Sequence, residues 1–280
     1  MSVERGGARM GFDIRGTGAP AHITAVAALL IVFLVHLTGQ IFARYSFITE
    51  ASQVLLMPAL AAILLSATVK PRMRIVKLGF VALFFSWVGD TLPRFMSGDA
   101  GFLAMIGGFL VAQCVYIIAF APYRRRSILT KPLYAAPYMA AVVLLLALCF
   151  DGAGTLFVPV ALYAVVIVAM AILATGLSTT GTIGGIVFLV SDSLIAIDAF
   201  AGLSLPGQGF WVMLTYVIGQ TLLIQAIIGQ EERNTVTRTP QGNGWTASPN
   251  EQRPTSGNGL EMPAPGRMPE MPVPDRMPPA

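Results

Sequence analysis

The sequence has few charged residues, and this shortage decides the class of protein before any motif does. Only 11% of the 280 residues are charged and 55% are hydrophobic, whereas an ordinary soluble domain carries roughly 25% charged residues. The mean hydropathy is correspondingly high, at +0.71. This composition excludes a soluble globular domain and indicates an integral membrane protein.

Cysteine and histidine are also scarce, with two of each in the chain. Cys114 and Cys149 both lie in apolar stretches and form no CxxC or Cys/His ligand pattern. Cysteines in such surroundings are usually inert packing residues. We therefore expect no disulfide framework, no metal site and no cofactor, and no P-loop, dinucleotide-binding, haem or zinc signature suggests otherwise.

What the sequence does contain is a series of apolar runs, each about as long as a helix that crosses hydrocarbon. They cover Ala21–Ala43, Ala51–Val69, Val76–Leu92, Phe102–Pro122, Leu133–Phe150, Leu156–Gly176, Thr182–Leu203 and Gly209–Gly229. The short connections favour antiparallel neighbours in a compact bundle. The sequence therefore predicts an all-α fold, a polytopic membrane bundle of eight transmembrane helices over residues 21–229.

The two flanks of this bundle differ from it in composition. Residues 1–20 are polar and glycine-rich, and we interpret them as an N-terminal tail. From Glu231 to Ala280 the chain is rich in Pro, Gly, Asn, Thr and Arg and ends in Met-Pro repeats. Because this stretch has almost no aliphatic residues to bury, residues 230–280 are predicted to be a disordered Pro/Met-rich cytoplasmic tail.

The basic residues alternate between the two faces of the predicted bundle. One face carries eleven of them: Arg5, Arg9, Arg15, Lys70, Arg72, Arg74, Lys77, Arg124, Arg125, Arg126 and Lys131. The other face carries only Arg44 and Arg94. Under the positive-inside rule this asymmetry places both termini in the cytoplasm of a multi-pass cell (inner) membrane protein. We therefore attribute the net charge of +4 to the basic residues that set the orientation of the chain in the membrane. Nucleic acid is not an expected partner.

Two aspartates lie inside apolar runs, in GFVALFFSWVGDTLPRF (Gly79–Phe95) and IVFLVSDSLIAIDAF (Ile186–Phe200). An acid inside a bilayer span is costly enough to indicate a functional site. Asp90 lies thirteen residues beyond Lys77, roughly 20 Å along a helix, and Asp192 lies ten residues beyond Thr182, roughly 15 Å along. The two acids therefore share one depth in the membrane, and we predict that they form one catalytic site.

Further polar residues fall at compatible depths. Gln113 and Tyr116 share one helix face, as do Tyr216 and Gln220, and Ser191 adjoins Asp192. Each could orient a substrate or simply form an interhelical hydrogen bond, which is the usual role of such residues in membrane bundles. His36 is open to the same two interpretations.

Asp198 lies near the outer end of the seventh run, six residues beyond Asp192 and on a different side of the helix. It could contribute to the site or reach water there.

The two acidic segments, together with FLAMIGGFLVAQCVYIIAF, LLMPAL and YVIGQTLLI, resemble the YhhN-like lysoplasmalogenase family of eight-span membrane proteins. The similarity covers about residues 50–229. Two positions depart from the family pattern: Gln113 stands where a histidine is expected, and Gln53-Val54 stands where relatives tend to carry Lys-Pro. Both signature acids are retained.

The resemblance implies hydrolysis of the vinyl-ether bond of a lysoplasmalogen, with a lysophospholipid substrate, membrane lipids as surroundings and no cofactor. The residues fit this chemistry, because the reaction needs one protonated acid and one nearby carboxylate. Two acids in a low-dielectric site cannot both ionise easily, so the pair is expected to share a proton. The sequence does not say which aspartate is the acid. Tyr216, Gln113 and Gln220 could orient water or the headgroup.

Two other functions use acids within spans. An intramembrane aspartyl protease is excluded, because the Pro58-Ala59-Leu60 triplet precedes both acids and Trp87 occupies the first glycine position of a GxGD motif. A non-enzymatic proton-coupled transporter or lipid-binding membrane protein remains as the alternative, with the aspartates acting as a relay.

Reporter fusions test the predicted orientation. A reporter fused after Lys131 should lie in the cytoplasm and one fused after Asp99 should lie outside, because eleven of the thirteen basic residues in the N-terminal tail and the connecting loops lie on the face that contains Lys131. The reverse pattern would overturn the topology.

Overall fold

The computed structural model describes residues 19–42 and 47–238, and all regular structure in this part of the chain is helical. The α-helices are α1 (Ala19–Phe42), α2 (Phe47–Ala67), α3 (Arg74–Thr91), α4 (Gly98–Phe120), α5 (Pro132–Ala153), α6 (Phe157–Ala174), α7 (Thr179–Phe200) and α8 (Gln208–Arg238). Short 3-10 turns follow α3, α4 and α5. Helices are expected here, because a backbone in hydrocarbon must satisfy its own hydrogen bonds. The predicted all-α class is confirmed.

Seven helical segments of the described residues are long and apolar enough to cross a membrane. One of them, the 43 residues from Pro132 to Ala174, contains both α5 and α6. A straight helix of that length would measure roughly 65 Å, about twice the hydrocarbon thickness. The chain instead turns after α5 at Gly154, whose φ of +50° suits glycine. The prediction of eight crossings therefore agrees with the structure only if α5 and α6 are counted separately.

Helix α8 is longer than the sequence predicted, and it continues through residues 230–238, which were assigned to the disordered tail. Three hydrogen bonds tie this end of α8 to other elements: Met73 N to Glu231 Oε1 (3.3 Å), Arg233 Nη2 to Leu177 O (3.1 Å) and Asn234 Nδ2 to the Tyr123 hydroxyl (3.1 Å). The prediction of disorder is wrong for these residues, because their polar side chains find partners on the bundle. The rest of the predicted tail, residues 239–280, and residues 1–18 lie outside the described residues.

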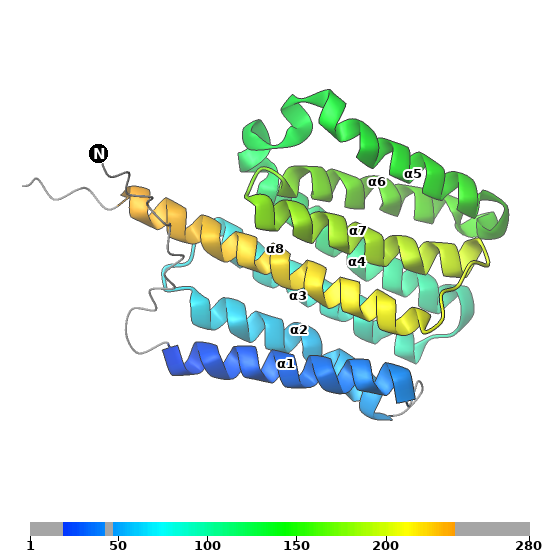
Figure 1. Ribbon diagram of the computed structural model, residues 1–280, viewed down its shortest axis with the longest axis horizontal. Coiled ribbons are helices and arrows are strands. Elements are labelled where there is room, and N and C mark those ends of the chain that lie inside the picture. Colours follow the sequence, from blue (N-terminus) through cyan, green and yellow to red (C-terminus); the bar gives the residue numbers. More distant parts are fainter. Residues whose placement is uncertain (1–18, 43–46, 239–280) are drawn as a thin grey trace, which may run out of the picture. The chain divides into compact units, whose positions relative to one another are not determined.

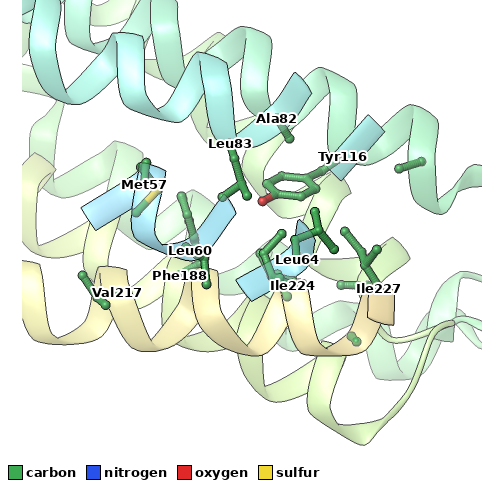
Figure 2. Packing of buried hydrophobic residues seen from close by; sticks show 14 of the residues in the cluster. Met57, Leu60, Leu64, Ala82, Leu83, Tyr116, Phe188, Val217, Ile224 and Ile227 are labelled. Atoms are coloured by element: carbon green, nitrogen blue, oxygen red, sulfur yellow. The ribbon is translucent and has the colours of Figure 1, made fainter. Parts of the chain in front are cut away.

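Helix α8 is the central element of the bundle. It packs against α1, α2 and α3 and most extensively against α7. In Figure 1 the pair α1–α2 lies on one side of α8, and the group α5, α6 and α7 lies on the other. The hydrophobic core forms around it, with Met57, Leu60 and Leu64 of α2 facing Val217, Ile224 and Ile227 of α8 (Figure 2). This apolar packing fixes how the helices lie against one another, and with them the polar residues that they carry.

Helices α3 and α4 approach each other most closely at two glycines next to Asp90. A Cβ atom on Gly108 would lie 2.6 Å from the Cα atom of Gly89, closer than real Cβ contacts allow. Small residues at such a crossing let two membrane helices pack backbone to backbone. The close approach fixes the position of the last turn of α3, which carries Asp90.

This crossing predicts a difference between two adjacent glycines. Gly108→Ala should destabilise the protein by about 1–3 kcal/mol, because the added methyl group meets the α3 backbone. Gly107→Ala is the matched control and should be neutral or slightly stabilising, since a Cβ there has no neighbour within 4 Å in the described part of the chain. Thermal unfolding of the purified proteins in detergent measures both effects. Equal melting temperatures for the two variants would contradict the close packing.

Candidate active site

Asp90 is buried in the last turn of α3 and is held from two other helices. The Tyr216 hydroxyl of α8 donates to Asp90 Oδ2 at 2.8 Å, and the Gln53 amide of α2 donates to Oδ1 at 3.4 Å. The residue Asp90 as a whole is 8% exposed. Both of its carboxyl oxygens therefore accept hydrogen bonds, and these bonds favour the charged form of the carboxyl group against the cost of its burial.

Arg94 extends this set of hydrogen bonds toward the end of the bundle. It lies in the 3-10 turn Leu92–Phe95, one helical turn beyond Asp90. Its Nη2 atom donates to Gln53 Oε1 at 2.7 Å, and its Nε atom donates to the backbone oxygen of Asp90 at 3.3 Å. Because Arg94 occupies the amide oxygen of Gln53, the amide nitrogen is left to face Asp90. Arg94 thus orients Gln53, and Gln53 positions the Asp90 carboxylate.

Asp192 lies in the middle of α7, half-buried, with different surroundings. Its Oδ2 atom accepts a hydrogen bond from the Tyr163 hydroxyl of α6. Both residues line a cavity of about 40 Å³ between α4, α6 and α7, otherwise lined by Phe102, Met105, Ile106, Phe109, Val160, Ile195, Ala196 and Phe200. A volume of this size holds a few waters or a short stretch of hydrocarbon chain. Asp192 is thus a carboxyl group at the wall of an apolar cavity.

The structure brings the two acids near each other, although they come from helices far apart in the sequence. The two carboxyl groups interact electrostatically, and so do Asp192 and Tyr216. Among the described contacts each carboxyl group is bonded to its own tyrosine, and no hydrogen bond joins the two directly. The ring of Phe109 packs edge-on to Tyr216, with centroids 5.6 Å apart, and also lines the cavity at Asp192. The Phe109 ring therefore lies beside both acid–tyrosine pairs.

Two other sequence-predicted site residues form a separate polar network. The Tyr116 hydroxyl donates to Gln220 Oε1 at 2.8 Å, and Gln220 Nε2 donates to Ser86 Oγ at 2.9 Å. All three side chains are fully buried. The network joins α4, α8 and α3 without a described contact to either aspartate. Tyr116 and Gln220 thus form interhelical hydrogen bonds, as one of the two interpretations of these residues expects.

The remaining candidates also have local partners. The Ser191 hydroxyl donates to the backbone oxygen of Val212 at 3.0 Å and thereby ties α7 to α8. Buried His36 has its Nδ1 atom 3.0 Å from Ser52 Oγ and joins α1 to α2, with no described contact to either acid. Asp198 is exposed, so its side chain does not join the site.

Gln113 is the exception among the polar residues of α4. Its side chain is fully buried, yet among the described residues neither its amide nitrogen nor its amide oxygen has a partner in hydrogen-bonding geometry. It interacts with the Tyr163 side chain and follows Phe109, a wall residue of the cavity, by one helical turn. An unpartnered buried amide destabilises a fold, so the position of Gln113 beside the Asp192–Tyr163 pair makes it a candidate to bind water or substrate there.

Sequence reasoning missed two residues of this site. Tyr163 partners Asp192, and the signal that could have found it is that it is the one polar side chain in the apolar helix Phe157–Ala174. Arg94 was used only to count charges, although it follows Asp90 by a single helical turn. No group of three or more His, Cys, Asp or Glu residues in the described part of the chain could hold a metal ion.

The comparisons with known proteins identify a family. The sequence matches the YhhN family over residues 48–227. No curated protein and no solved structure matches the chain. The matched range includes both aspartates, their tyrosine partners, Gln53 and Gln113, and it leaves out His36.

The two buried glutamines should respond in opposite directions to replacement by leucine. Gln113→Leu should stabilise the protein by about 1 kcal/mol, because it removes a buried amide without partners. Gln220→Leu should destabilise it by a similar amount, because it leaves the Tyr116 hydroxyl and Ser86 without their partner. Melting temperatures in detergent give both values. A lower melting temperature for Gln113→Leu would show that the amide contributes to folding.

Proposed function

Because the chain belongs to the YhhN family, we propose that it is a membrane hydrolase acting on lysoplasmalogen-type lysophospholipids. The enzyme cleaves the vinyl-ether bond and releases a fatty aldehyde and a glycerophospho-base. The observation that carries the proposal is the pair of intramembrane aspartates, Asp90 and Asp192, each bonded to its own tyrosine and near enough to influence the other. Membrane lipids surround the site, and no cofactor takes part.

The reaction requires an acid and a water molecule. Protonation of the outer carbon of the C=C bond gives an oxocarbenium ion, in which the positive charge is shared between the other vinyl carbon and the ether oxygen. Water adds to that carbon and loses a proton, which gives a hemiacetal. Collapse of the hemiacetal breaks the carbon–oxygen bond to glycerol and leaves the aldehyde. The proton that the acid donated is regained from water, so one water is consumed per turnover.

The surroundings of the two aspartates favour a division of roles. Asp192 lies at the wall of an apolar cavity with Tyr163 as its described hydrogen-bond partner, a setting that suits a neutral carboxylic acid. Asp90 accepts hydrogen bonds from Tyr216 and Gln53, a setting that suits a carboxylate. In our proposal Asp192 protonates the vinyl carbon, and the charge on Asp90 stabilises the oxocarbenium ion and accepts a proton from the attacking water.

The polar residues beside the acids complete the proposed site. Gln113 offers an amide donor and acceptor next to Tyr163 and is suited to orient the water. Tyr216 holds Asp90 and faces Phe109 and Phe188, whose ring centroids lie 5.6 and 5.7 Å from its own. These aromatic rings exclude bulk water, which strengthens electrostatic interactions inside the site.

The proposed enzyme crosses the membrane eight times, with α5 and α6 each forming one crossing, and has both termini in the cytoplasm. Helices α5 and α6 pack against each other around the Gly154 turn, as two successive crossings would. The basic loops at Lys70–Lys77 and Arg124–Lys131 lie at one end of the helices, and the turn containing Arg94 follows α3 at the other end. The active site then lies in the outer half of the bilayer.

Aldehyde release from purified protein tests the proposal. Wild-type protein should release fatty aldehyde from a 1-alkenyl lysophospholipid, and Asp90→Asn and Asp192→Asn should each reduce kcat by at least roughly 100-fold, because asparagine keeps the shape and removes the titratable proton. The double variant should be hardly slower than either single one, since residues that act as a unit do not contribute additively.

Asp198→Asn serves as the matched control. It should keep near-normal activity, because that side chain is exposed and lies away from the site. Near-normal hydrolysis in both Asp90→Asn and Asp192→Asn would refute the two-carboxylate mechanism and favour a proton relay.

A further inference from the structure

Arg94 has a position that its role in orienting Gln53 does not explain. It lies four residues beyond Asp90, roughly 6 Å along the chain direction of α3, at the end of the bundle opposite the basic loops. Among the residues that the structure describes, no other lysine or arginine lies at this end. Arg94, one turn beyond a buried carboxylate, is therefore placed to attract a negatively charged ligand.

The guanidinium group of Arg94 has two nitrogens held by hydrogen bonds within the protein and a third that could bind a ligand. Its Nη2 and Nε atoms are engaged by Gln53 and by the backbone of Asp90. The Nη1 atom faces Glu50 Oε2 at 3.8 Å, with the two side chains 22% and 60% exposed. A partly exposed ion pair at this distance contributes little to stability. A phosphate oxygen could replace the Glu50 carboxylate, because guanidinium forms shorter and stronger hydrogen bonds with a well-placed phosphate.

The apolar residues near Arg94 indicate where such a phosphate comes from. Phe47 and Ile48, which precede Glu50 in α2, are 83% and 60% exposed. Phe95, which follows Arg94, is 78% exposed. Exposed aromatic and aliphatic side chains at the end of a membrane helix lie where lipid headgroups meet hydrocarbon. The surroundings therefore favour a lipid phosphate over a soluble one.

We propose that Arg94 is the specificity-determining residue that binds the phosphodiester of a single-chain phospholipid substrate, with Glu50 as the group that the phosphate displaces. The inference rests on the proposed function and names the part of the substrate that this end of the site recognises. A three-carbon glycerol unit separates the phosphate from the ether oxygen, and it matches the one-turn offset between Arg94 and Asp90. Bound in this way, the headgroup places the vinyl ether at the level of the two aspartates.

The test compares a substrate with and without phosphate. Wild type, Arg94→Lys and Arg94→Gln are assayed with 1-alkenyl lysophosphocholine and with neutral 1-alkenylglycerol. In Arg94→Gln, loss of a charge-assisted hydrogen bond should lower kcat/KM for the phosphate substrate by roughly 10- to 100-fold. The kcat/KM for the neutral substrate should change far less. An equal loss with both substrates would show that Arg94 only positions Gln53 and Asp90, and would overturn the proposal.

A binding measurement separates this inference from the proposed reaction. Saturated 1-alkyl lysophosphocholine lacks the vinyl ether and is not cleaved, so its affinity can be measured by calorimetry in detergent. Arg94→Gln should bind it roughly 10- to 100-fold more weakly than wild type and bind 1-alkylglycerol equally well. Arg124→Gln, at the opposite end of the bundle, should match wild type with both ligands.

The two proposals fail in different ways. Arg94-dependent binding without any aldehyde release would refute the hydrolase and leave phosphate recognition standing. Aldehyde release with no effect of Arg94 on the phosphate preference or on binding would refute phosphate recognition alone. Soluble glycerophosphocholine is the control for the source of the phosphate. If it competed with the lysolipid at equal concentration, the assignment to a lipid would be wrong.

Discussion

A carboxyl group placed among membrane helices must find its hydrogen bonds inside the protein, because hydrocarbon offers none. This constraint accounts for the arrangement of five helices in this bundle. Asp90 on α3 is held by Tyr216 of α8 and Gln53 of α2, and Asp192 on α7 is held by Tyr163 of α6. Asp90 thus ties α3 to α2 and α8, Asp192 ties α7 to α6, and these polar contacts set the register in which the apolar faces pack.

Close helix packing makes these polar contacts possible. Gly89 and Gly108 let α3 and α4 meet backbone to backbone beside Asp90. Gly219 of α8 lies against the backbone of Phe188 in α7, where an added Cβ would come within 2.9 Å of a backbone nitrogen. The short distances keep the tyrosine hydroxyls within reach of the acids. In a membrane, where burial of apolar surface does not drive helices together, such packing and interhelical hydrogen bonds are the main sources of stability.

Much of this architecture follows from the sequence, since each helix is a long apolar run and each buried acid is conspicuous within one. Asp90, Asp192 and Tyr216 were predicted as site residues from the sequence, and in the structure Tyr216 donates to Asp90 while Asp192 accepts from Tyr163. Tyr163 was missed because a tyrosine in an apolar helix is usually a packing residue, and its partner becomes visible only in three dimensions. The helical extension to Arg238 was missed because polar composition predicts disorder, whereas Glu231 and its neighbours find partners on the bundle.

The central claim is that the two aspartates hold one proton between them, with Asp192 as the protonated member. Infrared difference spectroscopy of the purified protein at neutral pH tests it directly, because a protonated carboxyl group has a C=O stretching band that a carboxylate lacks. The account predicts one such band that shifts in heavy water, disappears in Asp192→Asn and persists in Asp90→Asn. A band that is lost in Asp90→Asn and kept in Asp192→Asn would reverse the assignment of acid and carboxylate. If neither substitution removed a protonated carboxyl band, the shared-proton site itself would be contradicted.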